Sequence, residues 1–225
     1  MNAFAPERAE ICRVGRSLFE RGRVHATAGN ISLRLPDAQG FLITPTDACL
    51  GFLQPDQLAH ADVLDNSAGA QLAGPRASKT LALHRAIYAA EPTAQCVIHT
   101  HSTQLVALTL EGVWRHDAIL PPITPYFVMK VGRVPLIAYH RPGDPNVATL
   151  VANEIAAARA RNAPIRAVML DRLGPNVWHD SPAAAMATLE ELEETARLWR
   201  TATPKPAPLT DAQIDELRSA FGARW

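Results

Sequence analysis

Short β-prone runs alternate with amphipathic helical windows along nearly the whole chain, and this alternation restricts the possible folds more than any other feature. Apolar residues at helical spacing predict helices over 6–22, 78–90, 102–110, 146–160, 183–200 and 211–221. Between them, β-prone runs predict strands over 30–35, 41–44, 95–99, 134–138 and 167–170. Such alternation predicts an α/β fold in which helices cover a mixed sheet.

The chain is long enough for one substantial hydrophobic core. Of its 225 residues, 48% are hydrophobic and 20% are charged, which is typical of a globular domain and not of a disordered chain. Residues 201–208 contain three prolines and predict a linker, after which Thr210 is expected to cap the last helix. We therefore expect one domain over 1–201 and a tail over 202–225 that packs on this domain or on a neighbouring subunit.

The pattern also predicts the ends and faces of two helices. Ser78 is expected to cap the helix that runs to about Ala90. The helix over 183–200 is expected to turn its glutamates mostly to solvent, namely Glu190, Glu191, Glu193 and Glu194. Its apolar side is expected to contain Met186, Leu189, Leu192, Ala196 and Leu198.

The balance of charges excludes a broad attraction to nucleic acid or to an anionic membrane, because Lys plus Arg and Asp plus Glu each number 22. No stretch of about 18 uncharged apolar residues predicts a membrane helix, and charges interrupt residues 1–23 as they would not in a signal peptide. Three cysteines without CxxC spacing fit reduced thiols. We expect a soluble, cytoplasmic protein with neither a nucleic-acid nor a membrane partner.

Two histidines, His99 and His101, stand where a predicted strand gives way to a helix. On an extended backbone both imidazoles project from one face and could share a divalent ion, or they could be ordinary polar residues at a strand end. A metal site also needs a third protein ligand from elsewhere in the sequence. The candidates are His25, His84, His116, His140, His179 and Asp171.

Three further segments carry groups that could bind an anion. Gly29–Ser32 combines a glycine, which lets the backbone approach a ligand, with the amide of Asn30. Thr44–Asp47 supplies hydroxyl groups, and Ser78–Lys79 supplies a hydroxyl and an ammonium group at a predicted helix start. Each has a structural alternative: a turn, a local hydroxyl–backbone bond or a helix cap. They indicate a site only if the fold brings them together.

Taken in order along the chain, these segments resemble the class II aldolase/adducin family. The matching motifs are Gly29–Ser32, Ile43–Thr46, Ser78–Lys79 followed by His84, His99-x-His101 and Leu170–Val177, so the resemblance covers nearly the whole chain. Further segments look like the branch of 3-oxo-tetronate 4-phosphate decarboxylases, namely Thr46–Phe52, Tyr126–Met129, Tyr139–Pro145 and Leu209–Phe221.

The resemblance implies a three-layer α/β/α fold with a central mixed sheet, and a homotetramer with active sites between subunits. His99 and His101 would hold one Zn²⁺, Mn²⁺ or Co²⁺ ion per subunit. Tyr126 falls where the family has a tyrosine that reaches into a neighbouring subunit's site and passes a proton. The substrate phosphate would be held by Gly29, Asn30, Thr46, Ser78 and Lys79.

The reaction that this resemblance implies is cleavage of a carbon–carbon bond in a small phosphorylated sugar or sugar acid. A metal that chelates the ketone and an adjacent hydroxyl oxygen withdraws electrons, so that cleavage leaves an enediolate. Loss of an aldehyde is the retro-aldol reaction, and loss of carbon dioxide is decarboxylation. The phosphate contacts orient the bond that breaks.

Two positions depart from the family pattern. Thr80 stands where the family usually has a glutamate acid/base, and threonine cannot replace a carboxylate base near neutral pH. Leu173 stands where the family has its third metal histidine, and leucine cannot bind a metal. The replacement ligand could be His140, Asp171 or His179. His140 comes first because it lies beside the Arg-Pro-Gly-Asp-Pro turn, at a position where the decarboxylase branch more often has an aromatic residue.

These observations leave three functional hypotheses. The first is a metal-dependent lyase for a phosphorylated sugar acid, with Lys79 or Tyr126 partly replacing the missing base at the Thr80 position. The second is a catalytically impaired, adducin-like relative that serves as an oligomeric binding or scaffold protein and needs no metal. The third is a metallohydrolase, which predicts a carboxylate-rich metal cluster.

Overall fold

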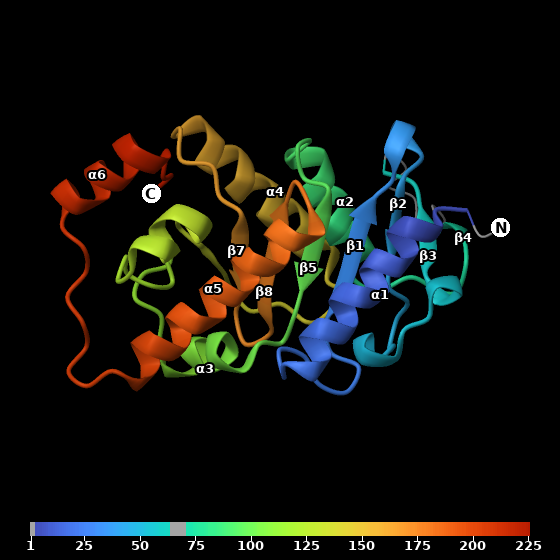
Figure 1. Cartoon of the computed structure of the whole chain (residues 1–225), viewed down its shortest axis with the longest axis horizontal. Coiled ribbons are helices and arrows are strands. Elements are labelled where there is room, and N and C mark those ends of the chain that lie inside the picture. Colours follow the sequence, from blue (N-terminus) through green and yellow to red (C-terminus); the bar gives the residue numbers. More distant parts are fainter. Residues whose placement is uncertain (1–2, 64–70) are drawn as a thin grey trace.

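The computed structural model describes residues 3–63 and 71–225, and its elements follow the predicted alternation (Figure 1). The helices are α1 (Ala5–Glu20), α2 (Leu81–Ala90), α3 (Thr103–Glu111), α4 (Pro145–Ala160), α5 (Pro182–Thr201) and α6 (Asp211–Phe221). The strands are β1 (Asn30–Arg34), β2 (Phe41–Ile43), β3 (Ala59–Ala61), β4 (Gln71–Ala73), β5 (Cys96–His99), β6 (Leu136–Ile137), β7 (Ala167–Leu170) and β8 (Gly174–His179). Among the described residues, no helix has the length and apolar character needed to cross a membrane.

The strands form one mixed sheet in the order β4-β3-β2-β1-β5-β8-β7-β6. In this part of the chain the ladders are antiparallel, except that β6 and β7 are parallel. The centre of the sheet matters for the site: His99 of β5 pairs with Asn30 of β1 on one side and with Asn176 of β8 on the other. Three strands that are distant in sequence therefore bring polar residues side by side.

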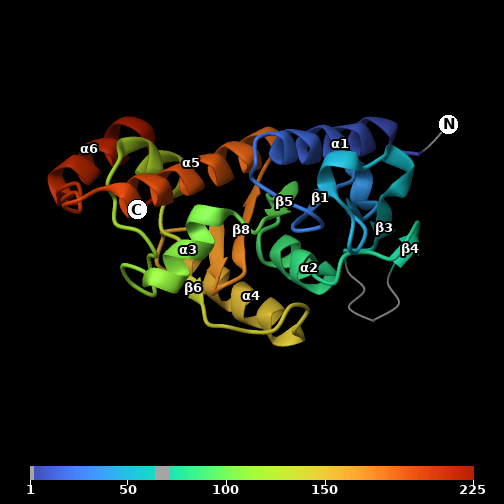
Figure 2. The ribbon, with the colours of Figure 1, turned by 90° about the horizontal axis from the view of Figure 1, so that it is seen from below.

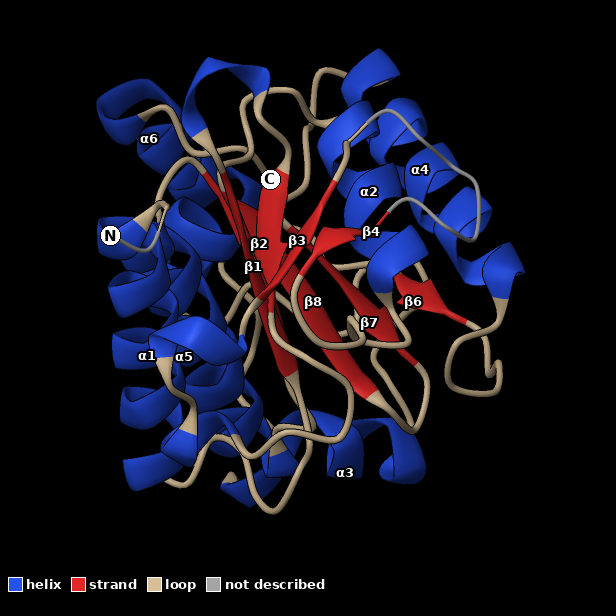
Figure 3. Ribbon diagram, turned by 90° about the vertical axis from the view of Figure 1, so that its right-hand side faces the viewer, coloured by secondary structure: helices blue, strands red, loops and turns tan. Residues whose placement is uncertain are grey.

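Helices cover both faces of the sheet (Figures 2 and 3). Figure 3 shows α1 and α5 on one side of the strands and α2 and α4 on the other. Side chains alternate along a strand, so Ile98 enters the core with Leu18 and Leu189, whereas its neighbour Val97 enters the opposite core with Ile87. The predicted three-layer α/β/α fold with a mixed sheet is confirmed.

The sequence pattern does not predict three of the strands. β3 and β4 are three-residue strands at one end of the sheet, too short to show a period. β8 lies in the centre, but it starts with Gly174, Pro175 and Asn176, residues that are rare in central strands. The Pro175 carbonyl accepts hydrogen bonds from the backbone N–H of Thr100 and from the His99 ring.

Two side chains of α5 lie on faces of the helix other than those predicted. Leu198 is 41% exposed, whereas Glu193 is only 3% exposed. Glu193 is buried because α3 begins beside it and has free N–H groups there. Its Oε1 accepts from the Gln104 N–H at 2.9 Å and its Oε2 from the Leu105 N–H at 3.1 Å. Burial raises the pKa of the Glu193 carboxyl, while these two hydrogen bonds oppose the rise.

We expect Glu193→Gln to lower the free energy of unfolding by about 1–2 kcal/mol, because the amide NH₂ would face one of the two N–H donors. Urea denaturation at neutral pH measures this. Glu194→Gln is the matched control, because Glu194 forms a surface pair with Arg197 and should change stability by less than about 0.5 kcal/mol. Equal stabilities of the two variants would contradict the capping role.

The residues after α5 make contacts within the same chain. Thr210 caps α6 as predicted, through reciprocal side-chain bonds with Gln213. The Leu209 N–H donates to the Pro122 carbonyl at 2.8 Å, and the ring of Trp225 meets Phe127 edge-on at 5.6 Å between centroids. The tail therefore packs against the segment that follows α3.

Candidate active site

One cleft of about 110 Å³ collects most of the predicted site residues, where β1 begins and β5 ends. The loops before β1, after β2, before α2 and after β5 all contribute to it. Its lining includes the predicted Gly29, Asn30, Thr46, Ser78, Lys79, Thr80, His99 and His101. The fold therefore brings the candidate anion-binding segments and the two histidines into one cleft, which is the condition under which these motifs indicate a site.

Gly29 lets β1 approach β5 closely at the floor of this cleft. Its φ is +87°, a left-handed conformation that favours glycine. A Cβ atom at this position would lie 2.8 Å from the carbonyl oxygen of His99. The glycine therefore keeps Asn30 next to His99.

The two histidines are neutral groups with their rings close together. The ring centroids of His99 and His101 are 5.1 Å apart. Burial lowers the pKa of His99 to about 3. The pKa of His101 is also lowered, mainly by burial and to a smaller extent by the charge of His25. The Nδ1 of His99 lies 2.9 Å from the Pro175 carbonyl, which can only accept, so Nδ1–H donates and Nε2 keeps a free lone pair. A backbone carbonyl that fixes the tautomer in this way is typical of metal-binding histidines.

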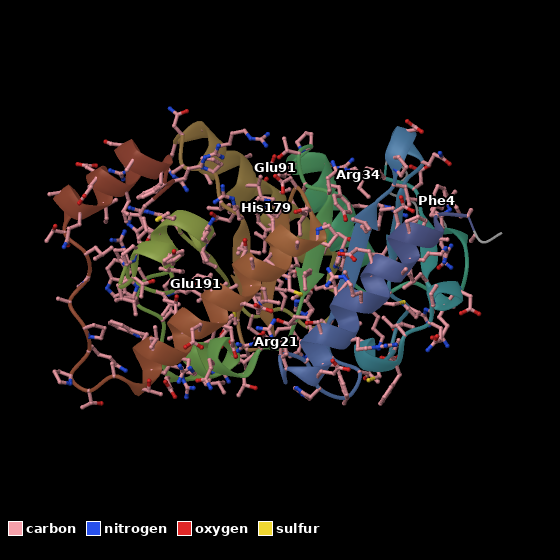
Figure 4. The ribbon with its side chains drawn as sticks, in the orientation of Figure 1. Phe4, Arg21, Arg34, Glu91, His179 and Glu191 are labelled. Carbon is pink, nitrogen blue, oxygen red and sulfur yellow. The ribbon has the colours of Figure 1, made fainter. Side chains whose placement is uncertain are left out.

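The predicted replacement ligands do not join this pair. His140 lies in a neighbouring pocket, with its Nδ1 2.7 Å from the Ala138 carbonyl, and Asp171 lines neither pocket. His179 is the last residue of β8, at the end of the strand away from the histidine pair. It is labelled in the upper half of Figure 4, whereas α3, the helix that follows His101, lies at the lower edge of the molecule in the same orientation (Figure 1). Leu173 lines the cleft itself. Within residues 3–63 and 71–225, no group of three His, Cys, Asp or Glu side chains is arranged to hold a metal ion.

The turn before α2 forms the cationic wall of the cleft. Ser78 does not cap α2 as expected, because the helix begins later, at Leu81, and the Ser78 Oγ lies 3.0 Å from the Thr80 Oγ1. The Lys79 Nζ is 3.2 Å from an Asp47 oxygen, and both side chains are more than half exposed. Because an exposed ion pair contributes little stability, an anionic ligand can replace Asp47 as the partner of Lys79.

Two buried polar side chains near the cleft have positions that the sequence analysis did not foresee. His84, a candidate metal ligand by residue type, instead contacts Asn30 and Ser32 inside the core. Asn176 is fully buried next to His99 across β5 and β8, and neither polar atom of its side chain has a hydrogen-bond partner in the part of the chain that the structure describes. If β8 had been recognised as a strand, its register with β5 would have predicted the position of Asn176 beside His99.

Tyr126 does not line the cleft. It is 63% exposed and immediately precedes a turn of π-helix, Phe127–Val131. Its predicted proton-transfer role requires the site of a neighbouring subunit and stays a prediction.

The three-layer fold is that of class II aldolases, and the comparison with protein families agrees. The family model described as "Class II Aldolase and Adducin N-terminal domain" matches residues 9–200. The chain belongs to this family, as its motifs indicated.

The curated relatives identify the branch. A 3-oxo-tetronate 4-phosphate decarboxylase of Cupriavidus necator is 54% identical over 97% of this chain and 97% of its own. The protein of the same name in Escherichia coli K12 is 40% identical over 94% of this chain and 95% of its own. These relatives bear out the expected resemblance to the decarboxylase branch and the expectation of a class II aldolase-type lyase.

Solved structures agree at the level of the fold. YgbL from Klebsiella pneumoniae is 39% identical, covers 95% of this chain and 98% of its own, and superposes with a TM-score of 0.84. An L-fuculose 1-phosphate aldolase superposes with a TM-score of 0.80 over 98% of both chains, at 22% identity. The fold is therefore shared by relatives that differ widely in sequence.

Proposed function

We propose that this protein is a cytoplasmic, metal-dependent lyase that decarboxylates 3-oxo-tetronate 4-phosphate. The observation that carries the proposal is the single cleft in which the anion-binding segments meet His99 and His101. The names of the relatives that match nearly the whole chain supply the substrate.

Two neutral imidazoles of the cleft would hold a divalent ion such as Zn²⁺, Mn²⁺ or Co²⁺, without the third protein ligand that the sequence analysis called for among the described residues. His99 offers a free Nε2 in a fixed tautomer, and His101 offers a second neutral imidazole beside it. When bound, such an ion would withdraw electrons from the substrate's ketone oxygen. With two protein nitrogens and Leu173 at the position of the family's third ligand, the affinity for the ion should be modest, and oxygen atoms of substrate or water would complete its coordination.

The remaining residues of the cleft would bind and orient the substrate. The phosphate would be contacted by Lys79, Ser78 and Thr46. Gly29 would allow its close approach to the backbone, and the amide of Asn30 would donate a hydrogen bond to it. Because the phosphate is remote from the bond that breaks, these contacts orient that bond without taking part in its cleavage.

The loss of the family's glutamate favours decarboxylation over retro-aldol cleavage. Retro-aldol cleavage starts when a base removes a hydroxyl proton, and Thr80, whose hydroxyl bonds to Ser78, cannot act as that base. Decarboxylation of a 3-oxo acid starts from a carboxylate that is already ionised. The bond to carbon dioxide breaks, its electron pair is shared between the neighbouring carbon and the ketone oxygen, and that carbon then takes a proton. Tyr126 from a neighbouring subunit of a homotetramer would supply this proton, or Lys79 would supply it if its ammonium group faced the reacting carbon instead of the phosphate.

We expect Lys79→Ala to reduce kcat/KM for carbon dioxide release by roughly 30-fold, because a charge-assisted contact to the substrate is lost. The assay uses 3-oxo-tetronate 4-phosphate with Zn²⁺, Mn²⁺ or Co²⁺ supplied in turn. Lys205→Ala is the control, because Lys205 lies near Trp199 after α5 and away from the cleft. If Lys79→Ala left kcat/KM unchanged, Lys79 would not be a substrate-binding residue.

The adducin-like alternative is favoured by one observation, the presence of Leu173 and Thr80 at positions where the family has catalytic groups. It would be supported if none of the three metal ions produced carbon dioxide release while calorimetry still detected binding of 4-phosphoerythronate. Decarboxylation with any of these ions would exclude it.

A further inference from the structure

A chain of buried hydrogen bonds runs beneath the cleft, from the side chain of Asn30 to that of Tyr88. His84 of α2 is completely buried in its centre. Its Nε2 lies 2.6 Å from the Asn30 Oδ1, and its Nδ1 lies 2.7 Å from the Ser32 Oγ. The Ser32 Oγ in turn lies 2.8 Å from the hydroxyl of Tyr88. Every member of this chain is less than a tenth exposed.

The donors and acceptors of this chain run in one direction. A neutral imidazole has one N–H donor and one acceptor, and a carbonyl oxygen such as the Asn30 Oδ1 only accepts. The His84 Nε2–H therefore donates to Asn30, and Nδ1 accepts from the Ser32 hydroxyl. Ser32 then accepts from the Tyr88 hydroxyl. The other acceptor near the Tyr88 hydroxyl, the Gln95 carbonyl, lies farther away, at 3.3 Å against 2.8 Å for the Ser32 Oγ.

This direction determines which atom of the Asn30 amide is left for a ligand. The Oδ1 is occupied by His84, while the Nδ2 has no hydrogen-bond partner among residues 3–63 and 71–225. Asn30 lines the cleft together with Ser78 and Lys79, so its two free N–H donors add to a group of donors. The reverse orientation of the amide would present an oxygen to an anion and would repel it.

We propose that His84 is a positioning residue, which holds the amide of Asn30 with its NH₂ group toward the anionic end of the substrate. This role rests on the proposed function. His84 touches no substrate and acts only through Asn30. Since burial and the neighbouring His99 keep the His84 imidazole neutral, with its pKa lowered to about 3, the direction of the chain persists at neutral pH.

Two substitutions separate positioning from packing. His84→Gln keeps an amide N–H donor near the place of Nε2, whereas His84→Asn is shorter, keeps a polar group only near Nδ1 and leaves Asn30 without its partner. We expect His84→Asn to raise the Kd for 4-phosphoerythronate about tenfold and the KM of decarboxylation to a similar degree, with little change in kcat. His84→Gln should restore both values to within about threefold of wild type.

The wild-type protein supplies a test that does not depend on how the variants fold. In ¹⁵N NMR spectra of the imidazole, His84 should carry its proton on Nε2. A proton on Nδ1 would overturn the proposal, because the Asn30 amide would then be turned with its oxygen toward the cleft. Equal affinities of the Gln and Asn variants would also overturn it while leaving the proposed function intact. A wild-type protein that binds no 4-phosphoerythronate would overturn the proposed function and, with it, the role of His84.

Discussion

Replacing His99 with alanine should reduce the rate of decarboxylation by about three orders of magnitude or more and abolish binding of a divalent ion. The site offers two protein nitrogens for an ion, so the loss of one leaves a single imidazole, which cannot hold the ion at micromolar concentrations. Withdrawal of electrons by a bound ion is worth several kcal/mol of barrier, and each 1.4 kcal/mol is about tenfold in rate.

Metal analysis and carbon dioxide release, measured on the same samples, test this expectation. Removal of the metal from wild type with a chelator should reproduce the loss of activity, and added Zn²⁺, Mn²⁺ or Co²⁺ should restore it in wild type alone. His179→Ala is the matched control, because this histidine lies on the same sheet at the far end of β8, beside Asp180. It should keep nearly full activity.

His99 is only 2% exposed, so its replacement also leaves a cavity. His101→Ala provides the same test at a half-buried position, where the fold should tolerate the change. If either variant kept both full activity and a stoichiometric ion, the histidine pair would not be the metal site. Activity of wild type that survives complete removal of metal would contradict the metal-dependent proposal as a whole.

Gly174→Ala should destabilise the protein by about 4 kcal/mol or more, or prevent it from folding. The φ of Gly174 is +138°, which L-residues rarely adopt. A Cβ atom there would lie 1.9 Å from the Thr100 carbonyl oxygen and 3.2 Å from the Cα of His101. Neither backbone atom can move without separating the start of β8 from the end of β5. The steric cost therefore adds to the cost of the backbone conformation.

Gly112→Ala separates these two costs. Gly112 has a φ of +113°, but a Cβ atom there would meet no described residue within 4 Å, so this variant should lose only about 1–2 kcal/mol. Urea denaturation measures both variants, and the yield of soluble protein is the readout if Gly174→Ala does not fold. Similar losses in the two variants would show that the contact between β8 and the His101 segment is not tight.

The extent to which the sequence predicted the elements can be judged from α5 and β8. The helix was predicted to within one residue at each end, because twenty residues show several turns of helical period. The buried position of Glu193 in that helix was not predicted, since it depends on the start of α3 packing against it. β8 was missed because its local composition argues against a strand, and its pairing with β5 and β7 overrides that composition.

Through its resemblance to the family, the sequence identified the two departures at Thr80 and Leu173. By itself it determined the alternation of strands and helices, the histidine pair and the candidate anion-binding segments. These are properties of residue type and short spacing, and they are complete once the order of residues is known. Tertiary structure alone decided that the segments share one cleft, that His140 stays outside it and that His84 holds Asn30. These relations depend on the pairing of β1, β5 and β8 and on the packing of α2 against them. Such contacts join residues that are distant in the chain, so they produce no periodic pattern in the sequence.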